Sequence, residues 1–541
     1  MIAYLANSLW ADGNLGPWYR FRRAVHDPGR VQRRILARSL RTNAETLFGR
    51  RHGFAGIRSA GQFQRRVPLA VYDDYVPWVD RIRGGEPSVL TREPVLRLMP
   101  SSGSTAARKL IPLTRGFLAE LRRAIGPWIV DLYRRDPRLK RGTAYWSISP
   151  AIGPPAGESS AVPIGFDDDS AYLGGLFQRI VERALAVPGA VRHLAALEDF
   201  RYATLLYLVR DRRLSFVSVW HPSFLTLLLE PLGRYWDRLL DDVAGGTLSL
   251  PGRDLEPALT RRLRPDRGRA EELRSLGPGA LRAIWPHLGM ISCWTDGHAE
   301  AAAAALRDRF PGVPVVGKGL VATEAFVSLP FAGARPLAVC SHFFEFLDAG
   351  GRPHLADELR SGGEYSVVVT TGAGLYRYQL QDRVRVERFL GATPCVRFLG
   401  KDDRISDRCG EKLSDGHVAA VLRQVLEPLE LGVRFAMLAP DEEDGTAGYT
   451  LYLESHREPT DALAAQLERA LGENPHYRYC AALGQLAPAR VFRVREAADA
   501  VYLDHQCRSG QRLGDVKPVA LSSDGGWTRR FEGHYLRRRS A

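Results

Sequence analysis

A turn near residue 100 has the composition of a phosphate-binding loop. The segment MPSSGSTAARKL gathers small hydroxyl side chains around one glycine and ends on a lysine: Ser101, Ser102, Gly103, Ser104, Thr105 and Lys109. Hydroxyls and the exposed backbone N–H groups of such a turn can bind phosphate oxygens, and an ammonium adds a point charge. The glycine-lysine pattern of a P-loop is absent. An ordinary polar loop that caps the helix expected after Thr114 is the alternative, and composition alone favours it.

Two carboxylates stand beside strand-like runs. Glu324 follows Thr323 in GKGLVATEAFVSLP, and a carboxylate at a strand end that faces a phosphate site is a natural Mg²⁺ ligand. Asp382 follows the alternating aromatic and basic residues of LYRYQLQDRVRV, which include Tyr376. A carboxylate held at a turn can accept hydrogen bonds from both hydroxyls of a ribose. A capping, surface or turn role is the alternative for each acid, and without context it is the commoner one.

Lysine is scarce in this chain. Of 75 basic residues only six are lysines: Lys109, Lys140, Lys318, Lys401, Lys412 and Lys517. Arginine supplies the general positive charge, so a lysine indicates a place that needs a compact ammonium on a flexible stem, with chance as the alternative. Lys517 follows a glycine-bearing turn in CRSGQRLGDVKPV. Reaching into a cleft, it would neutralise charge that develops on phosphate or acyl oxygens; a solvated lysine near the terminus is the other interpretation.

Other chemical patterns are weaker or missing. The acids at 167–169 in DDDSAYLGGL favour a helix start over a metal site. His221 and His298 follow expected strand ends, but a lone histidine is more often structural. No G-x-S-x-G elbow or H-E-x-x-H pair supports a serine hydrolase or a zincin. The six cysteines are widely spaced without a C-x-x-C pair, which favours reduced thiols over disulfides or a zinc knuckle.

Composition sets the class of protein. The chain has 541 residues, 45% of them hydrophobic, and no run of 18 apolar residues, so we expect a large soluble enzyme with no membrane partner. The first residues lack the positive segment of a secretory signal, and the cytoplasm is the default expectation. The net charge of +14 raises the possibility of nucleic-acid binding. Interleaved acids and the lack of long basic runs favour solvated surface arginine instead.

The pattern of elements divides the chain into three parts. Strand-like runs alternate with helices from 144 to 316, which predicts parallel β-α-β units. From 337 to 398 consecutive strands joined by turns predict a barrel-like or antiparallel element. A compact α+β segment follows, and we place the boundary near Gly400. Tryptophans that follow the expected strands, Trp146, Trp220 and Trp294, would line an acceptor pocket, with core packing as an equal explanation.

Taken in order, six segments resemble the signatures of the auxin-responsive Gretchen Hagen family of acyl acid amido synthetases, within the adenylate-forming superfamily. They are SSGSTAARKLIP, ISCWTDGHA, GKGLVATEAFVSLP, GLYRYQLQD, RFLGKDDRISDRCGEKL and GQRLGDVKPV. The resemblance implies an α/β fold with a large N-terminal lobe (residues 1–400) of parallel-sheet subdomains plus a β-barrel. It also implies a small, mobile α+β C-terminal domain (residues 401–541) that swings about a hinge between half-reactions.

The resemblance implies a two-step reaction as well. A carboxylic acid attacks the α-phosphate of Mg-ATP to give an acyl adenylate and pyrophosphate, and an amine, usually from an amino acid, then displaces AMP to form an amide. ATP and Mg²⁺ are the implied cofactors, and a small carboxylic acid and an amine are the implied partners. A thioester-forming ligase, and a degenerate basic protein that binds nucleotide or nucleic acid, are the alternatives.

The residue roles are likewise implied by the resemblance. Matching positions give phosphate binding to Ser101–Thr105, nucleotide and Mg²⁺ binding to Thr323 and Glu324, a lining role to Tyr376, ribose binding to Asp382, a hinge position to Asp403, and catalytic roles to Lys517, Glu324 and Lys109. Two departures from the family pattern stand out. The phosphate loop lacks its second glycine and is one residue short, and Gln381 replaces the glycine that usually precedes the ribose aspartate.

Overall fold

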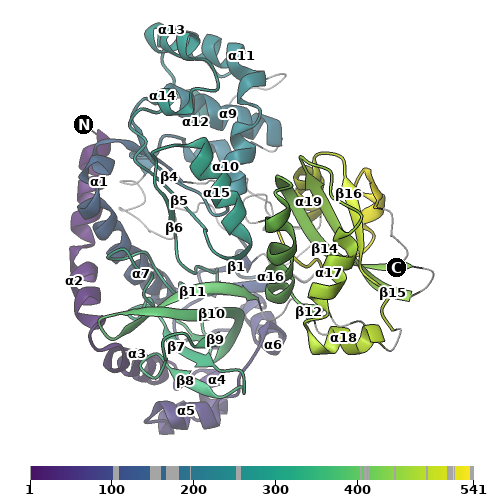
Figure 1. Cartoon of the computed structure of the whole chain (residues 1–541). Coiled ribbons are helices and arrows are strands. Elements are labelled where there is room, and N and C mark those ends of the chain that lie inside the picture. Colours follow the sequence, from purple (N-terminus) through teal and green to yellow (C-terminus); the bar gives the residue numbers. More distant parts are fainter. Residues whose placement is uncertain are drawn as a thin grey trace.

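The structure is a computed structural model with two lobes (Figure 1). It describes residues 2–101, 109–146, 160–165, 182–194, 196–250, 257–401, 405–406, 408, 411, 413–443, 446–482, 485–508, 516 and 518–536. Within this part of the chain, no helix combines the length and the apolar composition that crossing a membrane requires.

Helices and a short hairpin form the first part of the large lobe. The helices are α1 (Ile2–Gly13), α2 (Leu15–Ala24), α3 (Pro28–Thr42), α4 (Leu47–Arg51), α5 (Ala60–Arg66) and α6 (Tyr72–Arg83). Strands β1 (Arg97–Ser101) and β2 (Lys109–Leu113) then pair antiparallel. Helix α7 (Arg115–Arg135) begins as the sequence predicts, because the Thr114 hydroxyl accepts a hydrogen bond from the Phe117 N–H at 3.0 Å.

A four-stranded parallel sheet follows and confirms the predicted β-α-β pattern. Its order is β3-β4-β5-β6: Thr143–Trp146, Leu214–Ser218, Met290–Cys293 and Val315–Gly317. Helices α9 (Leu197–Arg210), α10 (Pro222–Leu229), α11 (Leu232–Gly245) and α15 (Glu300–Arg309) pack around it. The helical segment from 222 to 245 is divided at Pro231, which has no N–H to donate and separates α10 from α11.

The antiparallel element of the large lobe is a five-stranded sheet. Its order is β11-β10-β9-β7-β8: Thr393–Lys401, Tyr378–Leu390, Glu364–Thr370, Phe343–Leu347 and Pro353–Leu355. All four pairings are antiparallel, as the run of consecutive strands predicted. The inner face of this sheet joins helices α2 to α6 in one large hydrophobic core.

The small lobe is an α+β domain with its own core. Its sheet has the order β14-β15-β16-β17: Val433–Glu443, Thr446–Ser455, Arg490–Val494 and Gly533–Tyr535. The helices are α16 (Asp415–Leu426), α17 (Leu463–Leu471), α18 (Pro475–Ala482) and α19 (Ala498–Arg508). Helix α16 contacts β11 of the large lobe, and Figure 1 shows the small lobe beside α10 and α15.

Candidate functional site

The flanks of the serine-rich turn are fixed in the β1–β2 hairpin. Ser101 pairs with Lys109 across the two strands, and the Lys109 side chain is half-buried. Tyr72, the first residue of α6, holds the next residue of β2, because the Leu110 N–H donates to its hydroxyl oxygen at 2.6 Å. Ser102, Gly103, Ser104 and Thr105 lie outside the described residues, so their predicted phosphate contacts stay a prediction.

Glu324 lies in a tight turn after the last parallel strand. The Ala322 N–H donates to the Ala325 carbonyl at 2.9 Å, which closes the turn around Thr323 and Glu324. Glu324 is 7% exposed, whereas Thr323 is half-buried. A single carboxylate in this position matches the usual protein contribution to Mg²⁺ bound with substrate phosphates. No group of three or more acidic, histidine or cysteine side chains suited to a metal occurs in the described ranges.

Asp382 lies on β10 and is 3% exposed. Its Oδ1 lies 3.0 Å from Nζ of Lys401, the residue it faces on β11. Gln381, just before it, has φ +58°, in the left-handed region that favours glycine. The pairing of β10 with β9 is interrupted between Gln379 and Arg383, so the chain turns a corner there. This corner sets the direction of the Asp382 carboxylate.

The charges of Glu324 and Asp382 both affect one buried tyrosine, Tyr378. Burial raises the pKa of Tyr378, and the negative charges of Glu324 and Asp382 raise it further. Burial also raises the pKa of Tyr72, and the charge of Glu324 acts in the same direction there. Glu324 therefore acts electrostatically on both the Tyr72 and the Tyr378 phenols, Asp382 acts on the Tyr378 phenol, and the Tyr72 hydroxyl contacts β2 next to Lys109. Segments more than 200 residues apart in the sequence come together at this place.

Tyr376 requires a correction. The resemblance implied that its side chain lines the nucleotide site, but the ring is fully buried between Phe48 and Phe54, with centroid distances of 4.9 Å to each. Its hydroxyl donates to the Leu90 carbonyl at 2.8 Å. Arg377 has φ +50°, which breaks the strand alternation between Tyr376 and the next tyrosine. Tyr378 is the residue of this segment on which both carboxylates act, and nothing in the sequence pattern distinguishes it from Tyr376.

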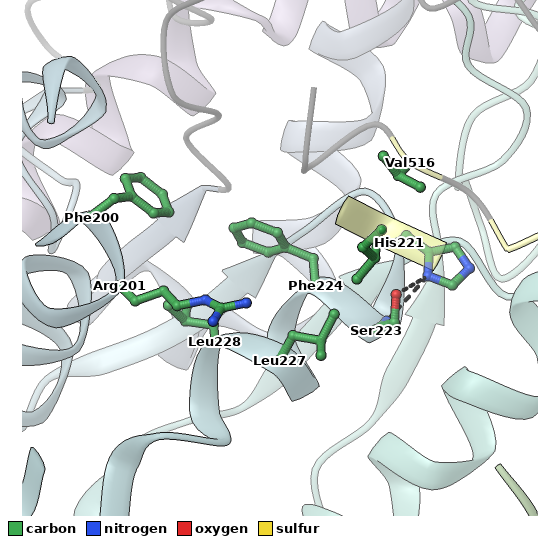
Figure 2. Close-up of a pocket in the computed structure, with 9 residues that line it drawn as sticks. Phe200, Arg201, His221, Ser223, Phe224, Leu227, Leu228 and Val516 are labelled. Atoms are coloured by element: carbon green, nitrogen blue, oxygen red, sulfur yellow. Dashed lines mark hydrogen bonds between the residues drawn. The ribbon is translucent and has the colours of Figure 1, made fainter. Parts of the chain in front are cut away.

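A pocket lies between the lobes, lined by residues of both. Figure 2 shows its lining residues: Phe200, Arg201, His221, Ser223, Phe224, Leu227, Leu228, Leu503 and Val516. His221 follows β4 and caps α10, because its Nδ1 accepts a hydrogen bond from the Ser223 N–H at 3.2 Å. Leu503 and Val516 come from the small lobe. Lys517 and Asp403 lie outside the described residues, as do the acids at 167–169.

The tryptophans predicted to line an acceptor pocket divide into two groups. Trp220 and Trp294 lie together at the carboxyl end of the parallel sheet, with ring centroids 5.7 Å apart and both rings half-buried. Trp146 contacts Trp10 and Trp128, with centroid distances of 5.5 Å and 6.2 Å. Its ring therefore also packs against α1 and α7, which is the core-packing role that the sequence left open.

Comparison with known proteins gives consistent matches along the chain. Three family models match: the GH3 family N-terminal domain over residues 18–315, the central domain over 336–401 and the C-terminal domain over 417–525. A probable indole-3-acetic acid-amido synthetase, GH3.12 of Oryza sativa subsp. japonica, is 26% identical over 457 residues, which cover 70% of each chain.

Solved structures match the whole fold. The AtGH3.15 acyl acid amido synthetase in complex with 2,4-DB superposes with a TM-score of 0.83 at 19% identity and covers 95% of each chain. A 2-hydroxyisobutyryl-CoA ligase in the postadenylation state, in complex with 2-HIB-AMP, has a TM-score of 0.51 at 13% identity and covers 91% of this chain and 89% of its own. These likenesses concern the fold.

Proposed function

This chain belongs to the GH3 (Gretchen Hagen) family, and from that premise we propose that it is an ATP-dependent ligase that joins a carboxylic acid to an amine. In the first step a carboxylate oxygen of the acid attacks the α-phosphorus of ATP, and pyrophosphate leaves. In the second step the amine attacks the acyl carbon, loses a proton and expels AMP, so that an amide forms. We propose an amino acid as the amine donor, because the curated relatives are named amido synthetases.

The observation that carries this proposal is that Glu324 and Asp382 both act electrostatically on Tyr378, and that Glu324 also acts on Tyr72, whose hydroxyl is hydrogen-bonded to β2 of the β1–β2 hairpin. A nucleotide needs an acceptor for its ribose hydroxyls and a separate site for its phosphates. A buried carboxylate can be the acceptor, and a serine-rich turn with a lysine can bind the phosphates. Asp382 would accept hydrogen bonds from the ribose hydroxyls. The turn at 101–105 and Lys109 would bind phosphate oxygens, and Thr323 would contact the nucleotide beside them.

Glu324 fits a divalent cation bound with ATP. The carboxylate is nearly buried yet belongs to a turn rather than to a strand interior, and Mg²⁺ is usually held by one or two carboxylates together with substrate phosphates. Bound there, Mg²⁺ would neutralise charge on the phosphates. The Glu324→Gln variant should need more Mg²⁺ for half-maximal pyrophosphate release, and Glu300→Gln, which alters an exposed ion pair with Arg397, should not.

We also propose that residues 401–541 are the mobile domain and that Lys517 assists adenylation. Val516, the residue before Lys517, lines a pocket together with His221 and other residues of the large lobe, so the described part of this segment lies against that lobe (Figure 2). An ammonium beside the α-phosphate would stabilise the negative charge that builds up as pyrophosphate leaves.

Pyrophosphate release in the presence of ATP, Mg²⁺ and a panel of carboxylic acids tests the proposal. We expect release that depends on the added acid, followed by AMP release that depends on an added amino acid. AMP release with coenzyme A but with no amino acid would replace the amide by a thioester. A protein that binds ATP but releases no pyrophosphate with any acid would refute the ligase assignment.

A further inference from the structure

One face of the parallel sheet carries a group of residues that the reaction steps above do not use. Ser218 of β4 pairs with Ser292 of β5, and Ser292 pairs with Val316 of β6. Because side chains alternate along a strand, the position two residues after Val316 lies on this same face. That position is Lys318. We call Ser218, Trp220, Ser292, Trp294 and Lys318 the Lys318 cluster.

The ammonium of Lys318 is held at a defined point of this cluster. The side chain is only 9% exposed, and its Nζ donates a hydrogen bond to Ser218 Oγ at 2.7 Å. The same nitrogen lies 4.7 Å from the centroid of the Trp220 ring, which Trp294 contacts in turn. An indole face attracts a cation and so stabilises the charge at this position.

Ser292 adds a second, independent feature. The residue is 2% exposed, and within the part of the chain that the structure describes its Oγ has no hydrogen-bond partner. Burying a hydroxyl without a partner is costly, so such a group indicates a place where a partner arrives from elsewhere. Its pairing with Ser218 puts it on the face where the Lys318 ammonium lies.

The cluster also lies where a ligand is expected. In open α/β sheets, ligands bind outside the carboxyl ends of the parallel strands. Strand β4 is two strands from β6, and neighbouring strands are about 4.8 Å apart, so Lys318 reaches about 10 Å across the sheet. The Lys318 ammonium contacts Ser218 of β4 across the sheet, whereas Glu324 belongs to the turn that follows β6.

We propose that the Lys318 cluster binds a second anionic group of the acyl acid, so that the preferred substrate is a dicarboxylic acid or a comparable acid with two negative charges. This inference rests on the proposed function, since it concerns the acid that the ligase activates. One carboxylate reacts at the α-phosphate. The other accepts hydrogen bonds from Lys318 and Ser292, while the half-buried Trp220 and Trp294 rings cover the carbon skeleton between them.

Matched pairs of acids test this proposal without any amine. Pyrophosphate release is measured with benzoate against isophthalate and with butyrate against succinate. For the native protein we expect kcat/KM about 30-fold higher for the preferred diacid than for its monoacid, which is the effect of one charged hydrogen-bonded pair. Lys318→Met should abolish this preference and leave the rate with the monoacid within about 3-fold of native.

Three further variants separate recognition from a structural role. Ser218→Ala should reduce the preference by about 5-fold, because it removes one neutral hydrogen bond to the ammonium. Lys318→Arg keeps the charge and should retain part of the preference. Lys140→Met is the matched control: Lys140 lies 5.9 Å from the Tyr133 ring, in the segment that precedes β3 at the opposite end of the sheet, and its loss should not alter selectivity.

The outcomes distinguish this inference from the proposed function. Equal use of monoacids and diacids, or a Lys318→Met variant that slows every acid alike, overturns the role of Lys318 and leaves the ligase assignment intact. Binding is read separately as the rise in melting temperature with each acid alone. If no acid releases pyrophosphate, the proposed function fails. In that case, a rise in melting temperature that is specific to diacids and is lost in Lys318→Met still supports the anion site. If no such rise is observed, the anion site is refuted as well.

Discussion

Replacing Asp382 by asparagine should weaken ATP binding selectively. The carboxylate is 4% exposed at the side chain and is assigned to two ribose hydroxyls. A hydrogen bond to a charged acceptor contributes about 1.5–3 kcal/mol, and the amide keeps one weaker acceptor, so we take a loss of about 3 kcal/mol for the pair. At 1.4 kcal/mol for each factor of ten, the KM for ATP should rise about 100-fold. The KM for the acid should change little.

The fold should tolerate this substitution. The partner Lys401 has a side chain that is 30% exposed, so its ammonium can turn to water when the carboxylate is gone. The cost in stability should be about 1 kcal/mol. Asp348→Asn is the matched control, because Asp348 also forms an ion pair, with His354 at 2.8 Å, at the other edge of the same sheet. Its KM for ATP should remain native.

The assay is initial-rate pyrophosphate release at saturating acid over a range of ATP concentrations, with melting curves for every variant. An Asp382→Asn protein that melts near the native temperature and keeps the native KM for ATP would refute the ribose assignment. A variant with unchanged KM but reduced kcat would show that the carboxylate acts on the reaction and not on nucleotide binding.

Three more predictions concern other parts of the molecule. Lys517→Ala should slow adenylation by about 100-fold or more with a native melting curve, and unchanged turnover would remove Lys517 from the mechanism. Gln381→Gly should raise the free energy of unfolding by about 0.5 kcal/mol, because it relieves a left-handed backbone at φ +58°, whereas Gln379→Gly should lower it by about 1 kcal/mol; urea denaturation of both variants measures the contrast. Asp499 has its pKa raised from 3.8 to about 6 by burial and by the charges of Glu454 and Glu230, against the opposing charge of Arg434. The folded protein therefore prefers the protonated acid and loses stability as pH rises from about 4 to about 6, so Asp499→Asn should be about 2 kcal/mol more stable at pH 7.5 and equal to native near pH 4.

The periodic parts of the fold were predictable from sequence. Alternating strands and helices between 144 and 316 identified the parallel sheet, since its buried strands read as short apolar runs between helical segments. Helix α7 was predicted from Arg115 to Arg135, and Thr114 supplies the expected cap. The break between α10 and α11 at Pro231 was not predicted. The apolar periodicity continues across Pro231, whereas the hydrogen-bonded helix does not.

The site was predictable as a set of segments but not as a set of side chains. Glu324 and Asp382 were chosen for their chemistry, and the structure brings both to Tyr378. Tyr376 was assigned a lining role by the resemblance, but its ring is buried against Phe48 and Phe54, and the left-handed backbone of Arg377 separates it from Tyr378. The Arg377 side chain is held by Glu345 at 3.1 Å, a contact between residues that no local pattern connects.

The Lys318 cluster is a second example of contacts that could not be predicted from sequence. The scarcity of lysine made Lys318 stand out, but no role could be assigned to it from sequence, because its partner Ser218 lies 100 positions away. Only the register of three parallel strands puts the two side chains on one face. Counting residue types can therefore identify unusual positions, whereas the register of the sheet determines which side chains are in contact.

Gln381 shows what a departure from a family pattern means physically. A glycine in a motif serves either to keep space free of a side chain or to allow a left-handed backbone, and sequence alone does not separate the two. Here the non-glycine residue adopts φ +58°, so the backbone corner before Asp382 is retained. Strain of about 1 kcal/mol is tolerated because the flanking pairs of β10 with β9 and β11 fix the chain on both sides. The corner therefore forms with glutamine at this position, and the Asp382 carboxylate that follows it lies 3.0 Å from the Lys401 ammonium.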